Sequence, residues 1–107
     1  MLPVSPKYQQ AFHNARITSL SMGYALAIHG SGIRDLDMIA IPFDPQLRCT
    51  PEELVGFVCE AINATIGMDK EYPIKYPHGR LCWILVIDAY HYVDFSVTPS
   101  VKEEENA

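Results

Sequence analysis

Two aspartates stand one residue apart at the start of an apolar run. Asp35 and Asp37 flank Leu36, and the apolar run continues through residues 38–43. Strand interiors are depleted in Asp, because a buried carboxylate loses its hydration and gains nothing from packing. In an extended strand the two side chains project to the same face, with alpha carbons roughly 6 to 7 Å apart. This spacing predicts a pair of carboxylates that share one ligand.

A third aspartate lies in a similar sequence setting. Asp94 stands between Val93 and Phe95, so in a strand its side chain is expected on the face opposite to theirs. Carboxylate oxygens are the hard ligands that Mg²⁺ prefers, and two-metal phosphoryl transfer needs a carboxylate pair and a further ligand near the attacking hydroxyl. Without a cation, such close anions repel and one of them takes up a proton at a raised pKa. The three aspartates therefore predict a Mg²⁺ site suited to phosphoryl transfer.

Two helices are expected on the basis of end signals and apolar spacing. The first covers residues 5–22, where Pro6 suits the first helical position. The second covers residues 50–66 and begins at a capping box formed by Thr50 and Glu53. Its apolar face continues until the next glycine, which is expected to stop it. Both helices are therefore predicted to bury one apolar side.

Four strands are predicted, over residues 24–28, 35–43, 80–87 and 92–97. The order helix, strand, strand, helix, strand, strand predicts an α+β fold. We expect two helices packed on one face of a small mixed or antiparallel sheet of about four strands. The length predicts a single domain over residues 1–107, with a core over about residues 5–98 and an acidic tail over residues 99–107.

The composition argues against several classes of protein. The chain is 49% hydrophobic and 20% charged, which is typical of a soluble globular domain. Its three cysteines are widely spaced and form no C-x-x-C motif, so we expect reduced thiols in a cytoplasmic protein. A net charge of −5 with eight scattered basic residues argues against binding nucleic acid by broad phosphate neutralisation. We also expect no membrane span and no secretion signal.

The motifs together resemble a known family. A Gly-Ser pair at residues 30–31, the D-x-D at residues 35–37 and the V-D-F at residues 93–95 are similar to the nucleotidyltransferase superfamily with the DNA polymerase beta-like fold. The resemblance covers roughly residues 5–98, and the predicted order of helices and strands fits the minimal form of that fold. It implies in-line attack of a hydroxyl on the alpha phosphorus of a nucleoside triphosphate, with loss of pyrophosphate.

The same resemblance implies a role for each motif residue. Asp35 and Asp37 would hold Mg²⁺, and Asp94 would complete the metal site and orient the acceptor hydroxyl. Gly30 and Ser31 would present hydrogen-bond donors to the triphosphate, as an anion-binding turn does. These residues are the candidate catalytic, metal-binding and substrate-binding positions.

The turn before the D-x-D is shorter than in the family. Only residues 32–34 separate it from the Gly-Ser pair, where family members usually place a longer segment with a phosphate-binding helix. Arg34 within this turn and Arg80 at the start of a predicted strand are further candidate donors to phosphate. This compact pattern resembles small phage-encoded and prophage-encoded proteins of the family.

Each candidate also has a purely structural interpretation. Asp35 and Asp37 could form a solvated turn with a salt bridge, and Asp94 could be a half-buried residue on an open sheet face. Arg80 could be an ordinary surface arginine, and His29 a hydrogen-bonded residue at a strand end. The choice between stacking on a base and packing over the sheet edge is open for the tyrosines Tyr72, Tyr76, Tyr90 and Tyr92.

Two functions from different classes follow from these motifs. The first is a Mg²⁺-dependent nucleotidyltransferase that moves a nucleoside monophosphate from a nucleoside triphosphate to a hydroxyl of an unknown acceptor. The second is a catalytically inactive module of the same fold that binds a nucleotide or a protein, as a homo-oligomer or beside a separate partner protein. A metal-dependent phosphodiesterase is a third, chemically close alternative. Catalysis requires the three aspartates to meet on one face of the sheet.

Overall fold

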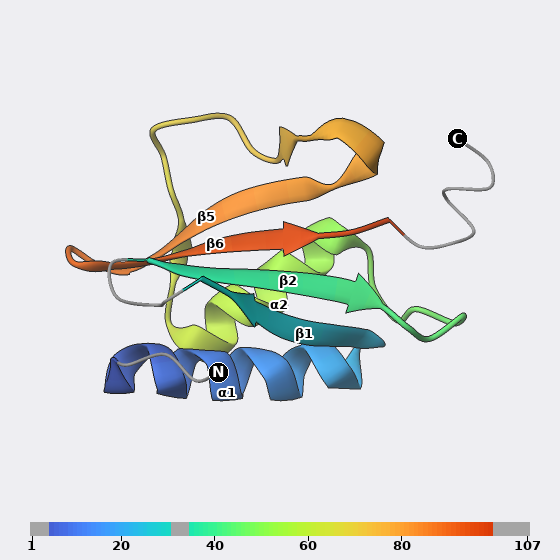
Figure 1. Ribbon diagram of the computed structural model, residues 1–107, viewed down its shortest axis with the longest axis horizontal. Coiled ribbons are helices and arrows are strands. Elements are labelled where there is room, and N and C mark those ends of the chain that lie inside the picture. Colours follow the sequence, from blue (N-terminus) through green and yellow to red (C-terminus); the bar gives the residue numbers. More distant parts are fainter. Residues whose placement is uncertain (1–4, 31–34, 100–107) are drawn as a thin grey trace.

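The computed structural model describes residues 5–30 and 35–99 and shows two helices with an open, mixed sheet of six strands (Figure 1). The elements are α1 (Pro6–Ser21), β1 (Tyr24–His29), β2 (Leu36–Pro42), α2 (Pro51–Ile62), β3 (Thr65–Ile66), β4 (Ile74–Lys75), the 3-10 turn η1 (Pro77–Gly79), β5 (Leu81–Asp88) and β6 (His91–Val97). The α+β fold class is therefore confirmed. In this part of the chain, no helix combines the length and the apolar character needed to cross a bilayer.

The strand order places β2 and β6 side by side near the middle of the sheet. The order is β1-β2-β6-β5-β3, and β4 also pairs with β5. The β2–β6 pair is parallel, whereas the other pairs are antiparallel. Because β2 and β6 come from opposite halves of the chain, their pairing brings distant segments of the sequence into direct contact.

Alternation along the strands separates a covered face of the sheet from an open face. On β2, Leu36, Met38 and Ala40 are fully buried, while Asp37 and Ile39 between them are partly exposed. Both helices cover the buried face, and in Figure 1 α2 lies behind the strands and α1 runs below β1. The core between helices and sheet includes Tyr8, Ala15, Leu54, Val58, Trp83, Leu85, Val93 and Phe95. The opposite, open face carries Asp37 of β2 together with Asp94 and Ser96 of β6.

The second helix is shorter than the sequence predicts. It begins at the predicted capping box, where the amide of Glu53 donates to Thr50 Oγ1 at 3.2 Å and the amide of Thr50 donates to Glu53 Oε1 at 3.0 Å. It ends at Ile62, because Asn63 adopts a left-handed conformation with φ 54° and ψ 48°. The expected continuation is wrong, since residues 65–66 form β3. Asn tolerates this conformation better than most residues, and the apolar spacing gives no sign of it.

Two short strands explain why the sheet has six strands rather than about four. Both β3 and β4 pair with β5, at residues 85–86 and 81–82 respectively. They lie one after the other along the outer edge of β5, joined by residues 67–73. Each has only two residues, which is too short for alternation to be recognised in the sequence. The segment between α2 and β5 is therefore tied to the sheet.

Replacement of Thr50 by alanine is expected to lower the free energy of unfolding by about 1 kcal/mol, because the first turn of α2 loses its side-chain acceptor. Urea unfolding followed by circular dichroism measures this change. Thr65→Ala, at an exposed position of β3, is the control and is expected to change stability by less than about 0.5 kcal/mol. Equal losses in the two variants would contradict the role of the cap.

Candidate metal centre

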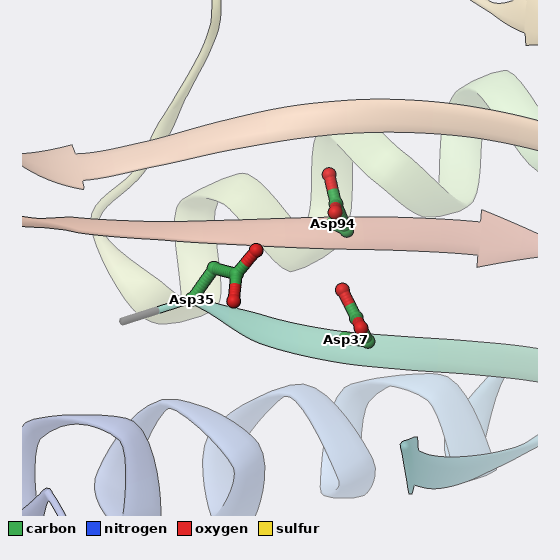
Figure 2. Close-up of side chains that lie close together, drawn as sticks. All are labelled: Asp35, Asp37 and Asp94. Atoms are coloured by element: carbon green, nitrogen blue, oxygen red, sulfur yellow. The ribbon is translucent and has the colours of Figure 1, made fainter. Parts of the chain in front are cut away.

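The three aspartates predicted as metal ligands lie together on the open face of the sheet (Figure 2). One carboxylate oxygen from each lies within 4.8 Å of the other two. Asp37 and Asp94 are direct partners in the parallel ladder between β2 and β6, and Asp35 comes just before β2. The structure thus brings together two segments that are far apart in the sequence. Metal binding by these residues stays a prediction.

Core packing fixes the register that places Asp37 beside Asp94. The neighbouring pairs in this ladder are Leu36 with Val93 and Met38 with Phe95. These four side chains are completely buried against the helices. A slip of one residue would turn them toward solvent and move the aspartates into the core, which both hydrophobic burial and charge desolvation oppose. The carboxylates are therefore held on the open face by the apolar residues around them.

The three close carboxylates give the cluster an excess of negative charge. The pKa of Asp94 is raised from 3.8 to about 6. Burial is the largest cause, followed by the hydrogen bond to Asp37 and by the negative charges of Asp37 and Asp35, while Lys70 acts in the opposite direction. A bound proton thus relieves part of the repulsion between the carboxylates. A divalent cation would relieve more of it.

The donor set fits a hard divalent cation. All three close side chains offer carboxylate oxygens, which Mg²⁺ prefers and which Mn²⁺ and Ca²⁺ also accept. Asp35 is exposed, and Asp37 and Asp94 are partly buried. Mg²⁺ commonly takes one or two protein carboxylates and fills the rest of its shell with water and substrate phosphate. The cluster is open enough for a substrate to share a bound cation.

A groove of about 540 Å³ extends across the open face beside the cluster. Its floor includes open-face positions of β2, β5 and β6, and residues of the segment before β5 also line it. The polar and charged residues along it include His29, Asp37, Lys70, Tyr76, Arg80 and Asp94. His29 is the ladder partner of Asp37 on β1. The groove therefore combines carboxylates with two cationic side chains.

The predicted phosphate donors are described only in part. Gly30 follows β1 and lies close to Asp37, since a Cβ atom built on it would be 3.4 Å from Asp37 Oδ2. Ser31 and Arg34 lie outside the described residues. Arg80 lines the groove, and its Nη1 donates to Ser96 Oγ at 2.9 Å. Substrate binding by Arg80 stays a prediction.

Two polar residues of the groove, Ser96 and Lys70, are not among the candidates predicted from the sequence. Ser96 is two positions after Asp94 on β6, so the same alternation that placed Asp94 on the open face also places Ser96 there. Lys70 comes from the segment between β3 and β4, whose path has no periodic signal. Its charge lowers the pKa of Asp94. The first residue could have been found from the sequence, whereas the second depends on how an irregular segment folds.

Replacement of Gly30 by alanine is expected to destabilise the protein by about 1 kcal/mol, because φ is +86° at this position and a side chain is strained there. Denaturant unfolding measures this loss. Gly56→Ala in α2 is the matched control, since an added Cβ has nothing within 4 Å and alanine favours the helix. It is expected to raise stability, and a loss of the same size in both variants would contradict the conformational strain expected at position 30.

Comparison with protein-family models, with curated proteins and with solved structures found no match for this chain. Its function is therefore inferred from the geometry of the aspartates, from the groove and from the sequence motifs.

Proposed function

We propose that this protein is a Mg²⁺-dependent nucleotidyltransferase that moves a nucleoside monophosphate from a nucleoside triphosphate to a hydroxyl group. The proposal rests on the convergence of Asp35, Asp37 and Asp94 on the open face of the sheet, with carboxylate oxygens within 4.8 Å of one another. The D-x-D and V-D-F segments, which resemble those of the nucleotidyltransferase superfamily with the DNA polymerase beta-like fold, support the same assignment. The small α+β fold with both helices on one face is compatible with the minimal form of that family.

The three carboxylates have distinct positions in this reaction. Asp37 would hold the cation from β2, Asp35 from the position just before β2, and Asp94 from β6. Bound Mg²⁺ supplies charge neutralisation at the phosphates and lowers the pKa of the attacking hydroxyl. Asp94 would orient the acceptor hydroxyl and take its proton, a role supported by its position in the groove that Ser96 and Arg80 also line. The hydroxyl oxygen forms the new bond to the alpha phosphorus, and pyrophosphate leaves with the electrons of the bond that breaks.

The groove suits a small phosphorylated substrate. Its volume of about 540 Å³ lies within the usual range of about 300 to 1,000 Å³ for small-molecule sites. Lys70 and Arg80 contribute positive charge, and Ile39 and Ile84 contribute apolar surface. The net charge of the whole chain is −5, which argues against binding a long stretch of nucleic acid by phosphate neutralisation. These features favour a nucleotide and a compact acceptor.

A nucleotide-binding module without turnover is the second candidate. The observation that favours it is the short sequence between the Gly-Ser pair and the D-x-D, where only residues 32–34 intervene. Three residues are fewer than the phosphate-binding helix of the family needs. Binding could then depend on the cation and on the groove alone, with the phosphates held too loosely for in-line attack.

Pyrophosphate release from each nucleoside triphosphate, with Mg²⁺ and a panel of hydroxyl compounds, tests the proposed activity. Calorimetric titration with a nonhydrolysable triphosphate, with and without Mg²⁺, measures binding separately. Metal-dependent release supports the transferase, and metal-dependent binding without release identifies the inactive module. Release of nucleoside monophosphate from an added nucleic acid would identify a phosphodiesterase instead. Binding of neither metal nor nucleotide would contradict the proposal.

A further inference from the structure

Arg80 is fixed in the groove by contacts with two residues. Its Nη1 donates to Ser96 Oγ at 2.9 Å, and its guanidinium carbon lies 4.1 Å from the centroid of the Tyr76 ring. The amide of Tyr76 also donates to the carbonyl oxygen of Arg80 at 2.9 Å. Ser96 is only 4% exposed, so the acceptor that holds the guanidinium is itself fixed within β6. Arg80 is therefore oriented before any ligand binds.

The charge of Arg80 has no carboxylate partner in the part of the chain that the structure describes. The ion pairs there involve other residues, and none includes Arg80 or Lys70. A guanidinium has five N–H donors, and the hydrogen bond to Ser96 uses one. Holding an arginine side chain in one conformation costs conformational entropy. Charge-assisted hydrogen bonds from the guanidinium to an anionic ligand in the groove would offset this cost.

Arg80 lies on one side of the aspartates and Gly30 lies on the other. Gly30 follows β1, at one edge of the sheet, and is close to Asp37. Arg80 comes just before β5 and contacts β6, beyond Asp94 in the strand order. The candidate metal centre is thus between two places where a substrate could bind. The Gly-Ser motif predicts the first of these places, and Arg80, which the sequence also offered as a phosphate donor, lies at the second.

We propose that Arg80 and Lys70 form a phosphate subsite in the groove, which binds a phosphate group other than the one that reacts at the aspartates. The planar guanidinium matches two phosphate oxygens, and the ring of Tyr76 keeps its plane fixed. Lys70 adds a second positive charge near the same cavity. That the ligand is a phosphate compound rests on the proposed function. The presence of an anion subsite does not.

In-line transfer limits what the subsite can hold. The attacking oxygen and the leaving group lie on opposite sides of the reacting phosphorus. If the phosphorus reacts at the aspartates, the Arg80 side of the groove belongs either to the leaving pyrophosphate or to the attacking acceptor. The phosphate bound by Arg80 is therefore part of the triphosphate tail or part of a phosphorylated acceptor.

Titration of ¹⁵N-labelled protein with inorganic phosphate tests the subsite directly. We use the Asp37→Asn background without metal, because it weakens the repulsion from the carboxylates and needs neither a cation nor turnover. Phosphate is expected to shift the amide signals of Tyr76, Cys82 and Ser96 in a saturable way. Adding Arg80→Gln is expected to weaken this binding by about tenfold or more, since charge-assisted hydrogen bonds are lost.

A matched charge change away from the groove is the control for the loss of Arg80. Arg16 is exposed on α1, so Arg16→Gln removes the same charge and is expected to leave phosphate binding unchanged. If Arg80→Gln impairs folding, Ser96→Ala is used in its place. Ser96→Ala keeps the charge of Arg80 and removes the hydrogen bond that orients the guanidinium. Equal affinity in the Arg80 and Arg16 variants, or no saturable shift at the groove, would overturn the subsite.

A second titration separates the two sources of the phosphate. Inorganic phosphate is added to the wild-type protein already saturated with Mg²⁺ and a nonhydrolysable nucleoside triphosphate. If the shifts at the groove no longer occur, the subsite holds the triphosphate tail. If they still occur, it holds the phosphate of an acceptor, and either result supports the subsite. Failure of Mg²⁺ to bind would overturn the proposed transferase while leaving the metal-free titration intact.

Discussion

Replacement of Asp37 by asparagine is expected to lower Mg²⁺-dependent pyrophosphate release by about 10³-fold or more, because a bound cation contributes several kcal/mol of transition-state stabilisation and loses a ligand. The same change is expected to stabilise the metal-free protein. After burial, which is the largest cause, Asp37 contributes most to the raised pKa of Asp94, and asparagine removes its charge. The free energy of unfolding at neutral pH should rise by about 1 kcal/mol, less than the full pKa shift implies, because solvent screens these partly exposed groups.

Opposite changes in activity and stability are what separate a metal ligand from a structural residue. Glu60→Gln, at an exposed position of α2, removes one negative charge on the helical side of the sheet and is expected to alter neither quantity. Urea unfolding in the presence of EDTA measures stability, and pyrophosphate release measures activity. A variant of Asp37 that loses both together would show that the aspartate holds the fold rather than a cation.

The stability of the metal-free protein is expected to fall as the pH rises from about 4 to about 6. Asp94 has a pKa of about 6 in the folded state and 3.8 as its ordinary value, so in this range the folded protein binds a proton that the unfolded chain has released. Asp94 therefore stabilises the fold below pH 3.8 relative to higher pH, and this contribution is lost as the pH reaches about 6. The decrease should total about 1 to 2 kcal/mol once solvent screening is allowed for.

Asp88 makes the protein more stable as the pH rises, which is opposite to the effect of Asp94, and it does so at lower pH. Its pKa is lowered, chiefly by hydrogen bonds from Lys7 and His91 and from the amide of Tyr90. Its stabilisation is present above pH 3.8 and is lost as the pH falls below that value. The two effects therefore occur in different pH ranges. The change in the free energy of unfolding between about pH 4 and about pH 6 is due to Asp94.

Mg²⁺ affinity is expected to depend on the protonation of Asp94. Because a cation must displace the proton on Asp94, the apparent dissociation constant for Mg²⁺ should decrease by up to about tenfold for each unit that the pH rises below pH 6, and level off above it. Calorimetric titrations at about pH 5 and about pH 7, together with urea unfolding in EDTA, measure both effects. Asp94→Asn should flatten the stability profile of the metal-free protein. A wild-type profile that rises steadily through this range would contradict the assignment.

The parts of the fold that could be predicted from the sequence are those fixed by near neighbours. Pro6 and the pair Thr50 and Glu53 mark helix starts, because capping needs residues only three positions apart. The end of α2 was missed, because Asn63 closes the helix in a conformation that the apolar spacing does not encode. β3 and β4 were missed as well, since two-residue strands exist only through their pairing with β5.

The candidate site divides in the same way. Alternation along each strand places Asp35 with Asp37, and Asp94 with Ser96, on the face opposite to the buried residues. Only the tertiary structure decided that β2 lies parallel to β6 with Asp37 opposite Asp94, because this register depends on the joint burial of side chains from distant parts of the chain. The tertiary structure also decided that Lys70 and Arg80 line the same groove. Lys70 comes before β4 and Arg80 comes after it, and the pairing of β4 with β5 fixes the position of this segment along the sheet. Local spacing sets the face on which a side chain lies, and packing of the whole core sets its neighbours.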